Sequence, residues 1–303
     1  MTGTHVVLGA TGVVGRETTA ALSAAGHGVV AASRSAPRTS GAESRSVDLT
    51  DGTAVIRALE SADVAYLTVG LPYTVRSWRT GWPRILRNTI DACVATGSHL
   101  VYFDNVYAYG STAQPMTEST PIRPSSRKGQ VRADLLDQLD TAARERGLGY
   151  TIGRSADFYG PGATTSVFNA FAVDRIAAGK PPTWLFDATQ PHSMTYTPDI
   201  GRALALLGTD PTARGRVWHL PTAPALTGEE YLALASGGVL PHRTMTATTM
   251  RIGALFTSGA REGLEMAYQN TQPYVFDSTA FEQTFGVRPT PYAEGIRATL
   301  ASA

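Results

Sequence analysis

A glycine-rich turn near the N-terminus is the feature that most restricts the fold of this chain. The apolar run HVVLG at 5–9 indicates a strand, and it passes directly into ATGVVG, which opens a helical pattern. A strand, a glycine turn and a helix in this order predict the first unit of a doubly wound parallel sheet, with phosphate groups held at the helix N-terminus. We expect Gly9 to allow the tight turn, Gly12 to let a pyrophosphate approach and Gly15 to let the helix pack closely. A plain tight turn is the competing interpretation.

The residues at the end of the second predicted strand indicate whether the chain binds NAD or NADP(H). An enzyme that selects NAD usually places an acidic residue here to bind the ribose 2′-hydroxyl, whereas this chain has Ser33, Arg34 and Ser35. An arginine can bind a 2′-phosphate, so the sequence favours NADP(H) over NAD, with Arg34 as a solvated loop charge the alternative. The full set of expected dinucleotide contacts is Gly9, Thr11, Gly12, Val13, Val14, Gly15, Ser33, Arg34, Asp48, Leu49, Thr68, Val69 and Gly70.

Apolar runs alternate with helical patterns through the first half of the chain. We expect strands at 28–33, 46–49, 64–70, 99–103 and 150–154, and helices at 51–60, 83–96 and 126–146. Strands that are apolar throughout and separated by helices indicate a parallel sheet covered on both faces. The predicted fold is therefore α/β, a doubly wound Rossmann sheet with a smaller C-terminal substrate cap. The core would comprise residues 1–162 and about 190–222, and the cap about 163–189 and 223–303, with one or two returns to the sheet.

Composition and charge exclude some classes of function. The formal net charge is +1, so no broad basic field is expected to attract nucleic acid. No apolar run approaches the length that spans a bilayer, and the first residues lack the features of a signal peptide. Cys93 is the single cysteine, so no internal disulfide can form and a reducing cytoplasm is the expected setting. Its thiol is expected to lie in the core.

Several motifs together resemble the extended short-chain dehydrogenase/reductase family, the NAD-dependent epimerase/dehydratase type. They are GATGVVG, NVYAYG at 105–110, RSADFYGPG at 154–162 and TYTPDIGRAL at 195–204, and the resemblance runs from the N-terminus through WHLP. It implies a Rossmann core, a substrate cap, a bound nicotinamide dinucleotide and a Ser/Thr–Tyr–Lys catalytic set. Members often dimerise through helices of the core, so a homodimer is also implied.

All three positions of that catalytic set carry other residues here. Asn105 stands at the serine position, Lys128 at the tyrosine position and Arg132 at the lysine position. A lysine ammonium can donate a proton, an arginine can bind ribose hydroxyls and an amide can polarise a carbonyl. We therefore expect Lys128 to be the proton donor and a dinucleotide contact, beside Asn105 and Arg132. Solvated charges at a helix start are the alternative, and Tyr107 and Tyr109 are rival donors.

Three further residues are expected on the substrate side. Asp157 and Tyr159 lie in the RSADFYGPG segment, and His192 lies in QPHSMTY. Asp157 could be a general base or a loop cap, and His192 and His219 could titrate near neutral pH. The histidines show no metal-ligand spacing, so no metal is expected. Phe168, Phe171, Trp184 and Phe186 suggest an apolar cap lining, although core packing would explain them equally well.

Three functions remain open on the sequence alone. The first is an NADP(H)-dependent oxidoreductase that reduces a carbonyl, or oxidises an alcohol, of a small substrate such as a secondary metabolite. The second is a redox-neutral epimerase, dehydratase or cyclase that uses the same fold. The third is a non-enzymatic regulator that binds NADP.

Overall fold

Seven parallel strands form the central sheet of the protein, in the order β11-β6-β5-β4-β1-β2-β3. The computed structural model describes residues 3–36, 40–238 and 241–303. The strands are β1 (Thr4–Leu8), β2 (Gly28–Ser33), β3 (Glu43–Ser46), β4 (Val64–Leu67), β5 (His99–Asn105), β6 (Tyr150–Ser155) and β11 (Val217–His219). This order, with β1 between β4 and β2, is that of a doubly wound sheet and confirms the predicted fold class.

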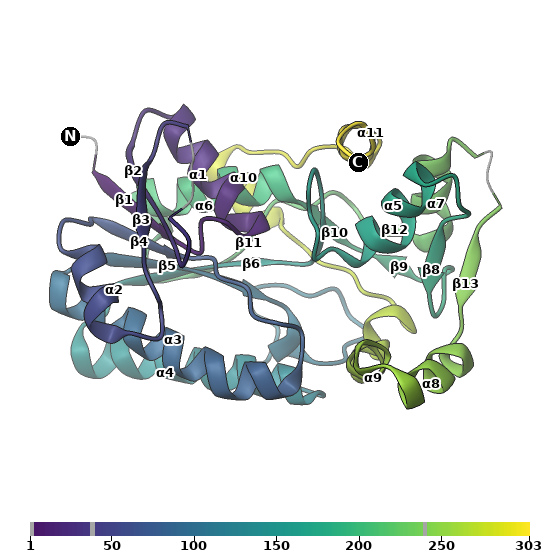
Figure 1. Ribbon diagram of the computed structural model, residues 1–303, viewed down its shortest axis with the longest axis horizontal. Coiled ribbons are helices and arrows are strands. Elements are labelled where there is room, and N and C mark those ends of the chain that lie inside the picture. Colours follow the sequence, from purple (N-terminus) through teal and green to yellow (C-terminus); the bar gives the residue numbers. More distant parts are fainter. Residues whose placement is uncertain (1–2, 37–39, 239–240) are drawn as a thin grey trace.

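Helices cover both faces of the sheet (Figure 1). One face carries α2 (Gly52–Leu59), α3 (Val75–Thr96) and α4 (Arg127–Arg146), and the other carries α1 (Val13–Ala24) and α6 (Thr197–Thr209). The C-terminal segment returns to the second face through α10 (Thr279–Phe285), whose Phe281 and Phe285 pack edge-on against Trp218 of β11. This return matches the crossing to the sheet that the sequence predicts.

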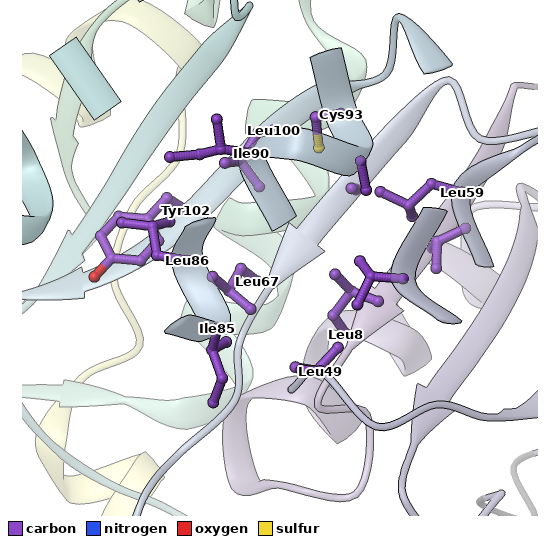
Figure 2. Close-up of a cluster of buried hydrophobic side chains, with 14 of the residues drawn as sticks. Leu8, Leu49, Leu59, Leu67, Ile85, Leu86, Ile90, Cys93, Leu100 and Tyr102 are labelled. Carbon is purple, nitrogen blue, oxygen red and sulfur yellow. The ribbon is translucent and has the colours of Figure 1, made fainter. Parts of the chain in front are cut away.

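The larger core cluster lies between the sheet and α2–α4, as Figure 2 shows. Leu8, Leu67 and Leu100 project from the strands toward Leu86 and Ile90 of α3, and all five side chains are buried. Each buried aliphatic side chain stabilises the fold by about 1.5–3 kcal/mol. Cys93 belongs to the same cluster and is 1% exposed, and burial raises the pKa of its thiol to about 12, which confirms a core thiol.

Several predicted boundaries are wrong, among them the end of β4, which lies at Leu67 rather than at 70. Two of the differences have a clear physical reason. The third strand is Glu43–Ser46 rather than 46–49, because an edge strand pairs on one side only and needs no apolar run. The third helix begins at Val75 rather than at 83, so Pro83 lies inside it. The Thr74 hydroxyl caps the helix by accepting from the Ser77 N–H, and the first turns bury Trp78 and Trp82, which holds the helix together ahead of the proline.

Whereas η3 (Pro211–Ala213) packs against β6 and β11 in the core, most of the remaining elements gather beyond the carboxyl ends of the strands (Figure 1). They have a core cluster of their own, built around Tyr159, Phe168, Trp184, Tyr231 and Tyr292. Thr227 and Glu230 form a reciprocal capping box at the start of α7 (Gly228–Ser236). The helical elements are η1 (Tyr107–Tyr109), η2 (a π-helix, Asn169–Val173), α5 (Asp174–Ala177), η3 (Pro211–Ala213), α7 (Gly228–Ser236), α8 (Ala247–Phe256), α9 (Ser258–Glu265), η4 (Ala267–Asn270) and α11 (Tyr292–Ala301). The strands are β7 (Asp157–Tyr159), β8 (Thr183–Leu185), β9 (Pro191–His192), β10 (Met194–Tyr196), β12 (Leu226–Thr227) and β13 (Arg243–Met245).

The exact division of the chain into core and cap stays a prediction. Among the described residues, no helix has both the length and the apolar character needed to cross a membrane.

Candidate active site

A cavity of about 760 Å³ lies where the carboxyl ends of the central strands meet the cap. Ligands of open α/β sheets bind in this position, at the point where the strand order reverses. Twelve of the residues predicted for the site line the cavity: Thr11, Gly12, Val13, Val14, Thr68, Val69, Gly70, Asn105, Tyr107, Arg132, Asp157 and His192. The other predicted residues lie outside its lining: Gly9, Gly15, Ser33, Arg34, Asp48, Leu49, Lys128 and Tyr159.

The glycine turn packs too closely for a side chain at two of its positions. Gly9 has a φ of +96°, and a Cβ there would lie 2.7 Å from the backbone of Val69. A Cβ on Gly15 would lie 2.2 Å from the Gly9 carbonyl oxygen, so the turn and the first helix can pack this closely only with glycine at both positions. Helix α1 begins at Val13 and directs the unpaired N–H groups of its first turn toward the cavity, where they can bind phosphate.

The end of β2 offers an exposed basic site beside the cavity. Arg34 is exposed, and its carbonyl oxygen accepts from the Ser46 hydroxyl. Ser33 is buried, and its hydroxyl has no hydrogen-bond partner within the described residues. The Asp48 carboxylate accepts from the N–H and hydroxyl of Thr50, and these bonds lower the pKa of Asp48. Both bonds are accepted by Asp48 Oδ1, and the charge of Arg34 also lowers the pKa of this carboxyl.

Lys128 is engaged by two carboxylates of α9. Its Nζ forms ion pairs with Glu262 and, at 3.0 Å, with Glu265, and it lies over the Tyr73 ring at 4.6 Å. Burial alone would raise the pKa of Glu265, but hydrogen bonds from the Lys128 side chain and backbone lower it below its usual value. From the sequence we expect a cation, Arg132, beside Lys128, whereas the groups in contact with its ammonium are anionic. The proton-donor role stays a prediction, and these contacts favour a structural role.

Arg132 lies in the cavity wall, bound to neighbours on the sheet. Its Nη1 donates to the Tyr102 hydroxyl at 2.7 Å and lies 3.6 Å from Asp104 Oδ1, and its guanidinium faces the rings of Trp78 and Trp82. Its Nε is buried with no hydrogen-bond partner within the described residues. The other Asp104 oxygen is bound by Arg154 at 2.8 Å. One carboxylate thus orients two arginines, one of which retains an unpaired N–H donor.

A tyrosine pair and an amide line the centre of the cavity. The hydroxyls of Tyr73 and Tyr107 lie 3.1 Å apart, and the Tyr107 ring stacks on Trp78. Burial raises the pKa of Tyr107 well above its usual value, and the nearby Tyr73 and Asp157 add to this, so the phenol stays protonated. Asn105 Oδ1 accepts from the Tyr107 N–H at 3.0 Å, which fixes the orientation of the amide at the end of β5.

Asp157 and His192 form a hydrogen-bonded pair on the cap side. His192 Nε2 lies 3.1 Å from Asp157 Oδ2, and its Nδ1 lies 3.1 Å from the carbonyl oxygen of Gln269. Each partner offers an acceptor oxygen, so a neutral imidazole can donate to one of them and a protonated imidazole to both. The imidazole stacks on Tyr274, with ring centroids 4.3 Å apart, and this contact fixes its plane.

Tyr159 and His219 lie away from these groups. Tyr159 is fully buried and packs against Phe168, Tyr196 and Tyr292 in the cap core. The expectation that His219 titrates near neutral pH is wrong. Burial, aided by the charge of Arg154, lowers the pKa of its imidazole to about 3.

Tyr73, Trp78, Trp82, Asp104 and Gln269 are site residues that the sequence analysis missed. The first three follow β4 in LPYTVRSWRTGW, where the loop and first turns of a helix lie at the carboxyl edge of the sheet. That position was the signal that could have identified them. Gln269 gave no signal, because it reaches the site only through the C-terminal return of the chain.

A family model, the NAD-dependent epimerase/dehydratase family, matches residues 5–220. No curated protein sequence matches the chain.

Solved structures with the same fold include UDP-sugar epimerases. UDP-glucose 4-epimerase from Thermotoga maritima superposes with a TM-score of 0.80 at 18% identity, covering 99% of this chain and 98% of that one. UDP-glucose 4-epimerase from Thermus thermophilus, in complex with NAD, has a TM-score of 0.76 at 21% identity, with coverage of 99% and 98%. UDP-glucuronic acid 4-epimerase from Bacillus cereus, bound to UDP-glucuronic acid and NAD, has a TM-score of 0.80 at 18% identity, with coverage of 99% and 98%.

Proposed function

Because this chain belongs to the NAD-dependent epimerase/dehydratase family, we propose that it acts on a hydroxyl-bearing carbon of a small molecule in a redox-neutral reaction of the epimerase or dehydratase type. The observation that carries the proposal is one cavity that joins the glycine turn to the Asp157–His192 pair and the Tyr73–Tyr107 pair. A bound nicotinamide dinucleotide would accept a hydride from that carbon and return it. The protein must supply the dinucleotide site and a group that moves the hydroxyl proton.

The residues around the glycine turn fit a dinucleotide. The first turn of α1 would hold the pyrophosphate, and Thr68, Val69 and Gly70 at the end of β4 would border its path into the cavity. The unpaired Nε of buried Arg132 would donate to the nicotinamide ribose. Arg34 and Ser33 would bind a 2′-phosphate, which favours NADP(H) over NAD for this chain.

Proton movement is assigned to the Asp157–His192 pair. The imidazole of the pair carries an exchangeable N–H proton that faces an acceptor oxygen. Both residues line the cavity, and Asp157 is half-buried, so a ligand can reach its carboxylate. Tyr107 would donate a hydrogen bond to the substrate oxygen, since its phenol stays protonated. Lys128 as proton donor, the sequence-based hypothesis, is the competing assignment.

Net reduction of a carbonyl by NADP(H) is the second candidate. The exposed Arg34 at the end of β2 favours this second candidate. A dinucleotide with a 2′-phosphate is commonly the one spent in net reductions, whereas a redox-neutral enzyme regenerates its dinucleotide in every cycle.

The two candidates differ in how much product one dinucleotide can support. Purified protein is incubated with a panel of secondary alcohols and the matching ketones, with the nucleotide far below the substrate concentration. Products are measured by mass spectrometry and reduced nucleotide by absorbance. Product well beyond the nucleotide supply, without net absorbance change, is the expected result. If the amount of product does not exceed the amount of nucleotide added, the result would favour net oxidoreduction. Nucleotide binding with no conversion of any substrate would favour the third alternative, a nucleotide-binding regulator.

A further inference from the structure

The wall of the cavity on the cap side is apolar. It is lined by Phe168, Phe171, Trp184, Leu185 and Phe186, from the segment before α5 and from β8 and its end. Polar groups on this side are uncharged hydroxyls and amides, such as Thr183 and Gln269, apart from the Asp157–His192 pair. Such a wall binds its ligand through buried apolar surface, worth about 25 cal/mol for each Å² removed from water.

Part of this apolar surface lies outside the core clusters. Phe168 and Trp184 belong to the cap core, but Phe171, Leu185 and Phe186 belong to none of the hydrophobic clusters formed by the described residues. All three line the cavity, and although Phe186 is buried, Phe171 and Leu185 are only partly buried. Phe171 and Leu185 therefore have apolar surface available to a ligand.

The backbone at Phe186 supports this interpretation. Its φ is +62°, and no other non-glycine residue in the described part of the chain has a positive φ. A bulky side chain in this region costs on the order of 1–2 kcal/mol, and such strain collects at functional sites. The strained residue is held by the hydrogen bond from its N–H to the Met245 carbonyl oxygen, at 2.9 Å. The effect is to place one aromatic ring in the cavity wall.

The cap side of the cavity lacks the positive charges that would bind a nucleotide diphosphate. Within the described lining, the residues with formal charge are Arg16, Asp104, Arg132 and Asp157. Arg132 pairs with Asp104 on the sheet, and Arg16 extends from α1 to donate to the Gly162 carbonyl oxygen. On the cap side the lining keeps only the Asp157–His192 pair. A diphosphate there would lack the cations that bind it.

We propose that the cap side of this cavity binds an uncharged, largely apolar substrate, with an aromatic or aliphatic body against Phe171, Leu185 and Phe186 and its hydroxyl or carbonyl group toward Asp157 and His192. This inference rests on the proposed function only for the position of the dinucleotide. His192 faces Trp184 edge-on at 5.8 Å, so the apolar wall ends where the proton-bearing pair begins. A ligand with an apolar body and one polar end would place the body on the apolar wall and the polar end at the Asp157–His192 pair.

Binding of two probes tests the proposal. Isothermal titration calorimetry is run on the protein saturated with NADPH, using 1-(2-naphthyl)ethanol as the apolar probe and UDP-glucose as the diphosphate probe. The naphthyl alcohol is expected to bind saturably, and UDP-glucose is expected to give no binding or at least tenfold weaker binding. Phe171→Ser should weaken the naphthyl alcohol by roughly tenfold, since it removes part of one buried aromatic contact. The matched control is Phe256→Ser, an 80% exposed phenylalanine outside the cavity lining.

Each outcome separates this inference from the proposed function. UDP-glucose binding more tightly than the naphthyl alcohol, binding of neither probe, or equal weakening by Phe171→Ser and Phe256→Ser would overturn the substrate class. NADPH binding, followed separately by its fluorescence, reports on the dinucleotide site. A protein that binds the naphthyl alcohol but not NADPH would keep the inference and remove the proposed function.

Discussion

Asp157 and His192 are paired across 35 residues of sequence, and the pairing changes what each can do. Considered alone, Asp157 would be a carboxylate that caps a loop, and His192 would be a buried ring without a chemical role. Together they form a hydrogen-bonded pair at the edge of a cavity, and the Gln269 carbonyl fixes which imidazole nitrogen faces the carboxylate. A carboxylate–imidazole pair in this arrangement is a general acid or base when a substrate oxygen lies within hydrogen-bond reach.

Substitution of Asp157 tests that role. Asp157→Asn keeps the size and a hydrogen bond to the imidazole but removes the negative charge, so turnover is expected to fall by about 10²-fold or more. The measurement is kcat for the best substrate of the alcohol panel. The control is Asp187→Asn, a cap carboxylate outside the cavity lining that accepts from Thr189. Equal activity of Asp157→Asn and the wild type would contradict the assignment.

Helix α9 connects the cap to two core helices through its carboxylates. Glu262 accepts from the Val75 N–H at the start of α3, and Glu265 accepts from the Lys128 N–H at the start of α4. Both also bind Lys128 Nζ. Acidic groups at helix N-termini satisfy unpaired N–H donors and interact well with the helix dipole. Since Gly263 and Met266 line the cavity, these contacts hold one wall of it in place.

Removal of Lys128 separates its two proposed roles. Lys128→Met leaves two carboxylates near each other without their cation and should lower the free energy of unfolding by about 3 kcal/mol. Lys128→Met/Glu262→Gln/Glu265→Gln removes that repulsion and should recover most of the loss. Urea denaturation measures both. If Lys128 serves to hold α9, the triple variant regains turnover together with stability. If Lys128 is the proton donor, turnover stays at least 10²-fold down while stability recovers.

The regular elements could be predicted wherever burial on both faces produces an apolar run. That holds for the central strands such as VAYL of β4 and for α4, which ends at Arg146 as predicted. It fails at β3, whose sequence ESRS has no apolar residue because the strand lies at the sheet edge. The glycine turn could be found because its residues are contiguous. The partners of Lys128 could not, because they lie 134 and 137 residues further along the chain.

Three buried histidines make the whole molecule sensitive to acid. Burial lowers the pKa of His5 and of His99 to about 4, and that of His219 to about 3. The unfolded chain, with an imidazole pKa near 6.5, therefore binds more protons than the folded one between about pH 6.5 and these lowered values. Stability is fully present above pH 6.5 and is lost as the pH falls toward 4.

Denaturation at several pH values tests this expectation. Each imidazole should remove stability at up to about 1.4 kcal/mol per pH unit between pH 6.5 and 4. Urea midpoints are compared at pH 7.5, 6.0 and 5.0 for the wild type and His219→Gln, which loses one of the three groups. The variant should show a shallower decline. A wild-type stability that rises on acidification through this range would contradict the burial of these imidazoles in neutral form.

The proposed function depends on a dinucleotide bound across the glycine turn, with Arg34 beside its adenosine end. The most direct measurement is a fluorescence titration of the wild type, Arg34→Ala and the exposed-arginine control Arg57→Ala with NADPH and NADH. We predict saturable NADPH binding that Arg34→Ala weakens by about 10- to 100-fold, while NADH binding and Arg57→Ala stay close to the wild type. Equal loss of both nucleotides in Arg34→Ala would contradict the NADP(H) preference. Binding of neither nucleotide to the wild type would contradict the central claim.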